Sequence, residues 1–113
     1  MKTTTASAPT TLPANVTRYL EAANRFDAAA DCFTADAAVH DENRDYLGRD
    51  AICAWVADTS RKYRPAFAVM RALVNEGDVT LSVAVSGQFP GSPVTLDYHL
   101  RLRDGKILTL TIE

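Results

Sequence analysis

The stretch FTADAAVHDENRDYLGRDAI, residues 33–52, shows where this chain changes from strand to helix. Its middle part AVHDE, residues 38–42, alternates as a short strand does. After Gly48 the apolar residues follow helical spacing, and Asp50 adds an acidic first turn. The stretch also holds five carboxylates and one imidazole, which are Asp36, Asp41, Glu42, Asp45, Asp50 and His40. It therefore indicates both a fold boundary and a place to look for chemistry.

The period of two in this strand separates its side chains into two faces. Val39 and Asp41 share one face, and His40 and Glu42 share the other. If Val39 faces the core, Asp41 faces it too. A metal site made of neighbouring His40, Asp41 and Glu42 is not favoured, because adjacent strand residues cannot converge on one ion. Residues 41–50 are accordingly read as a polar loop with one inward-facing acid.

Helical spacing extends on both sides of this strand. Residues 13–26 predict a first amphipathic helix, and Asp27 is placed to cap a short second helix over residues 28–33. Residues 49–63 predict a third helix, which Pro65 ends. The apolar stripes are Val16, Tyr19, Leu20 and Ala23 in the first helix, and Ile52, Trp55, Val56, Thr59 and Tyr63 in the last.

Beyond Pro65 the period changes from 3.6 to two, which predicts a sheet. Two strands meet at residues 75–78, a turn follows at 90–93, and Asp104-Gly105 joins the last two strands. In the third of these strands Leu96, Tyr98, Leu100 and Leu102 share one face, and Asp97, His99, Arg101 and Arg103 share the other. Helices followed by antiparallel strands predict an α+β fold, with the helices packed on one face of a strongly curved sheet.

The composition restricts the class of protein. The chain has 113 residues, 47% of them apolar and 23% charged, which suits one globular domain. The net charge of −2, with scattered basic residues, gives no reason to expect nucleic-acid binding. The sequence shows no secretory signal and no apolar run long enough for a membrane span, so we expect a cytoplasmic protein. Residues 1–12 are interpreted as a flexible leader and 13–113 as the domain.

Cys32 and Cys53 are the only cysteines and lie 21 positions apart, without the neighbouring ligands that a zinc site needs. We interpret them as small apolar fillers in a reducing compartment, with a disulfide or a reactive thiol as the alternative. No metal or cofactor is expected from these residues.

The order of elements and the pattern F-x-x-D-A-x-V-x-D, followed by G-x-x-x-I-x-x-W, resemble the nuclear transport factor 2-like superfamily. The resemblance covers residues 13–113. It rests on Phe33, Asp36, Ala37, Val39, Asp41, Gly48, Ile52 and Trp55. It implies the cone-shaped, cystatin-like fold shared by ketosteroid isomerases, scytalone dehydratase and SnoaL-like polyketide cyclases, with a deep apolar cavity between sheet and helices.

The resemblance also implies site residues. The stretch DAAVHD is similar to that of ketosteroid isomerases, which places Asp41 as the general base. Tyr19 precedes Asp27 by eight residues, the spacing between the oxyanion-binding tyrosine and the capping aspartate of those enzymes. Their third group, a protonated aspartic acid, corresponds to Tyr98, so the oxyanion site is absent here or rebuilt from two tyrosines. The substrate-binding wall is expected to contain Val39, Trp55, Tyr98 and Leu100.

Two functions remain open at this point. One is a cofactor-independent isomerase, cyclase or dehydratase that acts on a small apolar carbonyl compound, with Asp41 as base and Tyr19 as donor. The other is a non-catalytic ligand-binding or dimeric assembly module. In both cases a homodimer is expected through the outer sheet face, where the period of two predicts small and apolar side chains. These are Ala68, Met70, Ala72, Val74, Ser82, Ala84 and Ser86.

Overall fold

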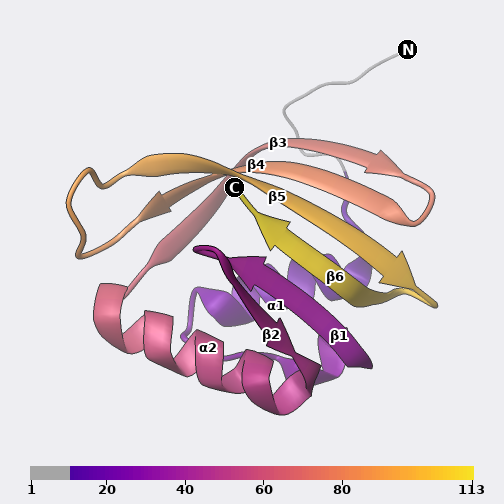
Figure 1. Cartoon of the computed structure of the whole chain (residues 1–113). Coiled ribbons are helices and arrows are strands. Elements are labelled where there is room, and N and C mark those ends of the chain that lie inside the picture. Colours follow the sequence, from indigo (N-terminus) through magenta and orange to yellow (C-terminus); the bar gives the residue numbers. More distant parts are fainter. Residues whose placement is uncertain (1–10) are drawn as a thin grey trace.

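The computed structural model of the chain describes residues 11–113, so residues 1–10 of the expected leader lie outside the described part. Within residues 11–113, two α-helices and a single 3₁₀ turn lie on one side of a six-stranded sheet (Figure 1). The elements are α1 (Ala14–Ala23), η1 (Ala30–Cys32), β1 (Phe33–Asp41), β2 (Arg44–Leu47), α2 (Gly48–Tyr63), β3 (Ala66–Asn75), β4 (Asp78–Ser86), β5 (Val94–Arg103) and β6 (Lys106–Ile112). The predicted α+β class is confirmed.

The strands are ordered β2-β1-β6-β5-β4-β3. All neighbours are antiparallel except β1 and β6, which run parallel. Figure 1 shows the sheet curling around the two helices, so that its inner face and the helices enclose the core. The largest fully buried side chains are Phe33, Ile52, Leu81, Leu100, Ile107 and Leu110. Within residues 11–113, no helix has the length and apolar character needed to cross a bilayer.

The prediction of a short second helix over residues 28–33 was wrong in its length. Only the 3₁₀ turn Ala30–Cys32 forms, and the next residue, Phe33, already begins β1. Asp27 Oδ1 accepts a hydrogen bond from the Ala29 amide at 3.2 Å. Ala29 itself takes a φ of 50°, which lies outside helical backbone. Asp27 therefore stabilises a turn instead of capping a helix.

The polar loop predicted after Asp41 is instead a hairpin. Asp41 pairs with Arg44, and β2 continues antiparallel to β1 as far as Leu47. Glu42 and Asn43 form the two-residue turn, with φ values of 53° and 62°. Both positive values are those of the tight turn that matches strand twist, which an asparagine tolerates well. The hairpin leaves Asp41 at the end of a paired strand, where its backbone position is fixed.

A β-bulge in β3 overturns the predicted outer face of that strand. The register shifts between Val69 and Arg71, which inserts one extra residue opposite β4. Ala72 and Val74 therefore pack against the core, while Arg71 and Leu73 face outward. An extra residue reverses the parity of every position beyond it, and no periodicity in the sequence marks where it occurs.

Candidate functional site

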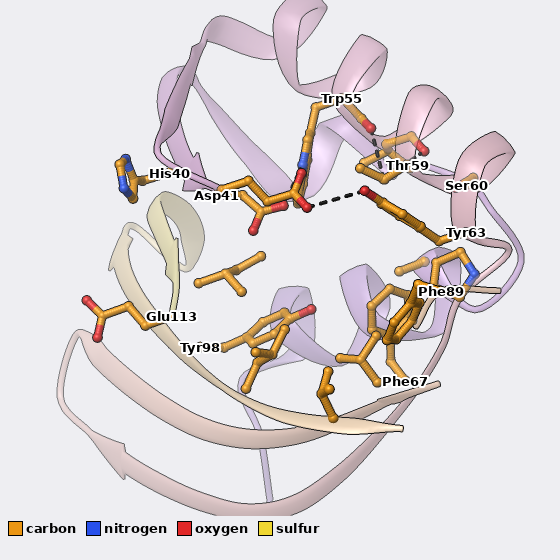
Figure 2. A pocket seen from close by; sticks show the side chains of 18 of the residues that line it. His40, Asp41, Trp55, Thr59, Ser60, Tyr63, Phe67, Phe89, Tyr98 and Glu113 are labelled. Atoms are coloured by element: carbon orange, nitrogen blue, oxygen red, sulfur yellow. Dashed lines mark hydrogen bonds between the residues drawn. The ribbon is translucent and has the colours of Figure 1, made fainter. Parts of the chain in front are cut away.

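A pocket of about 700 Å³ lies between the helices and one end of the curled sheet (Figure 2). Its walls come from α1, the second half of α2, the last residues of β1 and β6, and the adjoining ends of β3, β4 and β5. The side chains that line it are mostly apolar or aromatic, with a few carboxylates and hydroxyls. This is the composition expected of a small-molecule site.

Asp41 projects into this pocket from the end of β1 (Figure 2). The carboxylate is half-buried, and its Oδ2 accepts a hydrogen bond from Trp55 Nε1 at 3.1 Å. Burial raises the pKa of Asp41 above its usual value, and the negative charge of Glu42 adds to the rise. The Trp55 bond opposes it. The result is a carboxylate that is a stronger base than a solvated aspartate, with one oxygen oriented by an indole.

Two buried phenols, Tyr19 and Tyr98, line the same pocket. Their side chains are 2% and 3% exposed. Burial is the main cause that raises the pKa of both phenols, and the charge of Asp41 raises both further. Phenols with a raised pKa stay protonated at neutral pH, so each can donate its O–H. The structure therefore brings Asp41, Tyr19 and Tyr98 together around one space.

Val39 and Leu100, which were expected in the pocket wall, do not line it. They are 0% and 1% exposed and belong to the closed core. Each pairs with Leu110 of β6, so the three form an apolar row across the sheet. The parity predicted for them was right, but the pocket opens only beyond this row, at Asp41 and Tyr98.

Trp55, another expected wall residue, lines the pocket, and the structure places its Nε1 beside Asp41. Its indole packs on Tyr46 of β2, with ring centroids 5.9 Å apart. The hairpin that the sequence did not reveal thus supports the indole from behind, and the indole in turn orients the carboxylate.

Glu42 lines the pocket although strand parity had placed it on the opposite face. Its backbone leaves the strand with a φ of 53°, so the alternation no longer applies. Tyr63 of α2 donates its hydroxyl to Glu42 Oε2 at 3.4 Å, a bond drawn in Figure 2. Tyr63 lay on the predicted helical stripe, which was the available signal for it. The pair connects α2 to the β1–β2 turn. Because Glu42 is exposed, we call this part of the lining the mouth of the pocket.

Phe89 was missed because it lies in the β4–β5 loop, where no periodicity applies. Its ring meets that of Tyr63 edge to face, with centroids 5.8 Å apart. The loop is held close to α2, because the Gln88 amide donates to the Tyr63 carbonyl at 2.6 Å. A Cβ on Gly87 would lie 2.5 Å from that same carbonyl oxygen. The glycine is therefore what lets this loop close one end of the pocket.

His40 also lines the pocket, but its ring turns away from Asp41 in Figure 2. Its Nδ1 lies 2.7 Å from Asp45 Oδ1 on the neighbouring strand. Across residues 11–113, no three His, Cys, Asp or Glu side chains are grouped so that they could hold a metal ion. Cys32 and Cys53 are free thiols outside the pocket lining.

These features define a small α+β domain with a half-open pocket under a curled sheet. The chain belongs to the SnoaL-like domain family, whose model matches residues 16–109. The resemblance to the nuclear transport factor 2-like superfamily is thereby confirmed, together with the cystatin-like fold. Among curated proteins, none matches this sequence.

Solved structures agree with this membership. A protein from Sinorhizobium meliloti, described as a candidate polyketide cyclase, is 34% identical, with a TM-score of 0.87 over 90% of this chain and 95% of that one. A hypothetical protein with a ketosteroid isomerase-like fold from Catenulispora acidiphila, solved with trimethylamine, is 23% identical, with a TM-score of 0.79 over 91% of this chain and 86% of that one. An uncharacterised cystatin-fold protein from Novosphingobium aromaticivorans is 12% identical, with a TM-score of 0.73 over 88% and 94%. The last two show the fold alone.

Proposed function

We propose that this protein is a cofactor-independent enzyme acting on a small apolar carbonyl compound, as an isomerase, a cyclase or a dehydratase. The observation that carries the proposal is the half-buried Asp41 carboxylate, which shares one pocket with two buried phenols. A base of raised pKa and donors that stay protonated are the two components that proton abstraction next to a carbonyl requires.

The first step is the same for all three reactions. Asp41 takes a proton from the carbon next to the carbonyl. The electron pair of the broken C–H bond forms the C=C bond of the enolate, and the π pair of the carbonyl moves to its oxygen. Tyr19 and Tyr98 donate hydrogen bonds to the enolate oxygen that forms. Because Trp55 occupies Oδ2 of Asp41, Oδ1 is the oxygen left to accept the proton.

The fate of the enolate separates the three reactions. In an isomerase, Asp41 returns the proton to a different carbon. In a cyclase, the enolate carbon forms a bond with a second carbonyl carbon of the same molecule, and the proton goes to the new alkoxide. In a dehydratase, the C–O bond to a hydroxyl on the carbon next to the enolate carbon breaks, a C=C bond forms between these two carbons, and the hydroxyl takes the proton from Asp41 and leaves as water. The 34% identical protein from Sinorhizobium meliloti supports the cyclase among these.

Two tyrosines replace the mixed oxyanion site of the ketosteroid isomerases in this proposal. Asp97 is exposed on the outer face and cannot serve as the second donor. Tyr98, the next residue, faces inward and lies in the pocket with Tyr19. A site of two phenols keeps the hydrogen-bond donors but differs in shape, so we propose a substrate other than a steroid.

The test is solvent deuterium exchange into a panel of lipophilic ketones and diketones, followed by NMR. Asp41→Asn should lower the exchange rate by about 100-fold or more, because it removes the base. Asp58→Asn, an exposed carboxylate on α2, is the matched control and should leave the rate unchanged. Ketones that raise the melting temperature of the wild type without any exchange would favour the ligand-binding module instead.

We also propose that the outer sheet face forms a homodimer. Ala68 pairs with Ala84 there, and Met70 and Leu73 are 57% and 62% exposed nearby. A small and apolar sheet face of this kind suits a second copy of the same surface. Sedimentation equilibrium should give twice the 12.3 kDa chain mass, and Ala84→Arg should shift it to the monomer. A wild-type mass of one chain at every concentration contradicts this proposal and leaves the pocket proposal untouched.

A further inference from the structure

The charged side chains that line the pocket are nearly all negative. Asp41, Glu42 and Glu113 contribute carboxylates, and within residues 11–113 no lysine or arginine lines the pocket. His40 contributes an imidazole, and Asp45 engages it away from the pocket centre. Carboxylates around a cavity, without positive side chains to balance them, make the electrostatic potential inside it negative. Anionic ligands are therefore disfavoured.

Aromatic rings form much of the remaining wall. The six rings are Tyr19, Trp55, Tyr63, Phe67, Phe89 and Tyr98. The face of an aromatic ring attracts a cation, most strongly for tryptophan, and the attraction grows when water is excluded. Aromatic faces combined with carboxylates at the rim are the chemistry that recognises ammonium groups.

The hydrogen bonds of the mouth keep rings and carboxylates together. Trp55 Nε1 donates to Asp41, and Tyr63 Oη donates to Glu42. Each bond places an aromatic ring of α2 beside one of two consecutive carboxylates at the end of β1. Lys62 lies outside the pocket lining, with Nζ 5.4 Å from the centroid of the Tyr63 ring, so one cation already contacts this wall. Trp55, which also lines the pocket, is the ring type that attracts a cation most strongly.

We infer that the ligand of this pocket carries a positive charge, as an ammonium or quaternary ammonium group, attached to its apolar carbonyl body. The carbonyl lies toward Tyr19 and Tyr98, and the ammonium lies toward Trp55 and Glu42. This inference rests on the function proposed above and narrows its substrate class. A neutral ketone could fill the same space, but it would leave the carboxylates of the mouth without a partner of opposite charge.

A pair of isosteric ketones tests the charge alone. Phenacyltrimethylammonium and neopentyl phenyl ketone have the same shape and differ in one atom, a cationic nitrogen against a neutral carbon. We expect calorimetric titration of the wild type to show the cation binding about 10-fold more tightly. Raising the salt concentration from about 20 mM to about 500 mM should weaken binding of the cation and leave binding of the neutral ketone unchanged, because salt screens exposed carboxylates.

Two variants locate the effect. Glu42→Gln should reduce the affinity for the cation by about threefold or more and leave the neutral ketone unaffected. Glu76→Gln, the same change in the exposed β3–β4 turn, is the matched control and should change neither affinity. Both side chains are exposed, so both variants are expected to fold, and circular dichroism verifies this.

The outcomes separate this inference from the proposed function. If the neutral ketone binds as tightly as the cation or more tightly, the inference of a cationic ligand is overturned. The proposal of an enzyme that acts on a neutral carbonyl compound is then unaffected. An equal loss of both ligands in Glu42→Gln also overturns it, because charge recognition would then play no part. If neither ketone binds to the wild type, both the inference and the proposed site are wrong.

Discussion

The two ends of the inner sheet face differ sharply although the same strands build both. On β1, Val39 is fully buried, whereas Asp41 two residues later faces a pocket. On β5, Leu100 lies in the closed core, whereas Tyr98 lines the pocket. We call these the closed end and the open end. Strand parity alone cannot distinguish them, because each pair lies on the same face.

The helices make the difference between the two ends. At the closed end, Val16 of α1 and Ile52 of α2 fill the space above the sheet. About two turns further along, three of the helix positions that line the pocket are Ala23 on α1, and Thr59 and Ser60 on α2. Small and polar side chains cannot fill the volume that valine and isoleucine fill at the other end. The pocket therefore lies where the helices present these smaller residues alongside the larger Tyr19, Trp55 and Tyr63, which also line it.

The largest expected effect is the difference in stability between leucine truncations at the two ends. Leu100→Ala at the closed end should lower the free energy of unfolding by about 3 kcal/mol, since it leaves a cavity in a packed core. Leu96→Ala on the same strand, at the open end, should cost about 1 kcal/mol, because that side chain borders an existing space. Urea denaturation measures both. Equal losses would mean that the open end is packed as tightly as the closed one.

A second prediction concerns the loop that closes one side of the open end. Gly87→Ala should cost about 2 kcal/mol, because the added Cβ would meet the Tyr63 carbonyl oxygen at 2.5 Å and that oxygen belongs to rigid backbone. The change should also loosen Phe89 from Tyr63 and weaken ligand binding. Thermal unfolding and a binding titration measure the two effects. A variant as stable as the wild type would show that the loop shifts freely.

The residues whose place in the pocket the sequence predicted are those governed by a regular period. Tyr19 and Trp55 lie on helical stripes, and Asp41 and Tyr98 follow from alternation along paired strands. In each case one local rule determines the direction of the side chain. The α+β fold follows from the same regularities, summed over the whole domain.

The residues that the sequence did not predict lie where such a period is interrupted. Glu42 turns inward because its φ is positive, and Phe89 is positioned by a loop that Gly87 allows close to α2. The bulge at Met70 reversed the parity of β3. Val39 and Leu100 had the correct parity, but how far the pocket extends along a strand depends on side-chain volumes of the facing helices. Such volumes act between distant segments and are not visible in a local pattern.

The third prediction concerns the hydrogen bond that orients the base at the open end. Trp55→Phe removes the indole donor to Asp41 Oδ2 while keeping an aromatic ring. The pKa of Asp41 should rise further, since burial remains and the bond that opposed it is lost. NMR titration of the carboxyl carbons measures the shift. Asp31, whose pKa Arg18 holds low, is an internal reference that should not move. An unchanged pKa of Asp41 would mean that the indole contributes nothing to the basicity of this carboxylate.

The smallest effect is the pH dependence of stability that the open end imposes on the domain. Burial raises the pKa of Asp41 in the folded state above its unfolded value near 4. In the pH window between these two pKa values, the folded state therefore binds more protons than the unfolded state. The stability that this group contributes is thus present at low pH and is lost as pH rises through the folded pKa. Asp41→Asn has no such loss.

The variant should therefore become more stable relative to the wild type as pH rises through this window, and the difference should stay constant above it. The gain should be under about 1 kcal/mol, because the carboxyl is only half-buried and solvent screens it. Asp31 and Asp36, whose pKa values Arg18 and Arg103 lower, make both proteins less stable as pH falls. Since that loss is common to both, it cancels in the difference between their urea midpoints measured from pH about 3 to about 8. A difference that shrinks with rising pH would mean that Asp41 is held as a stabilised anion, which is incompatible with its role as a base of raised pKa.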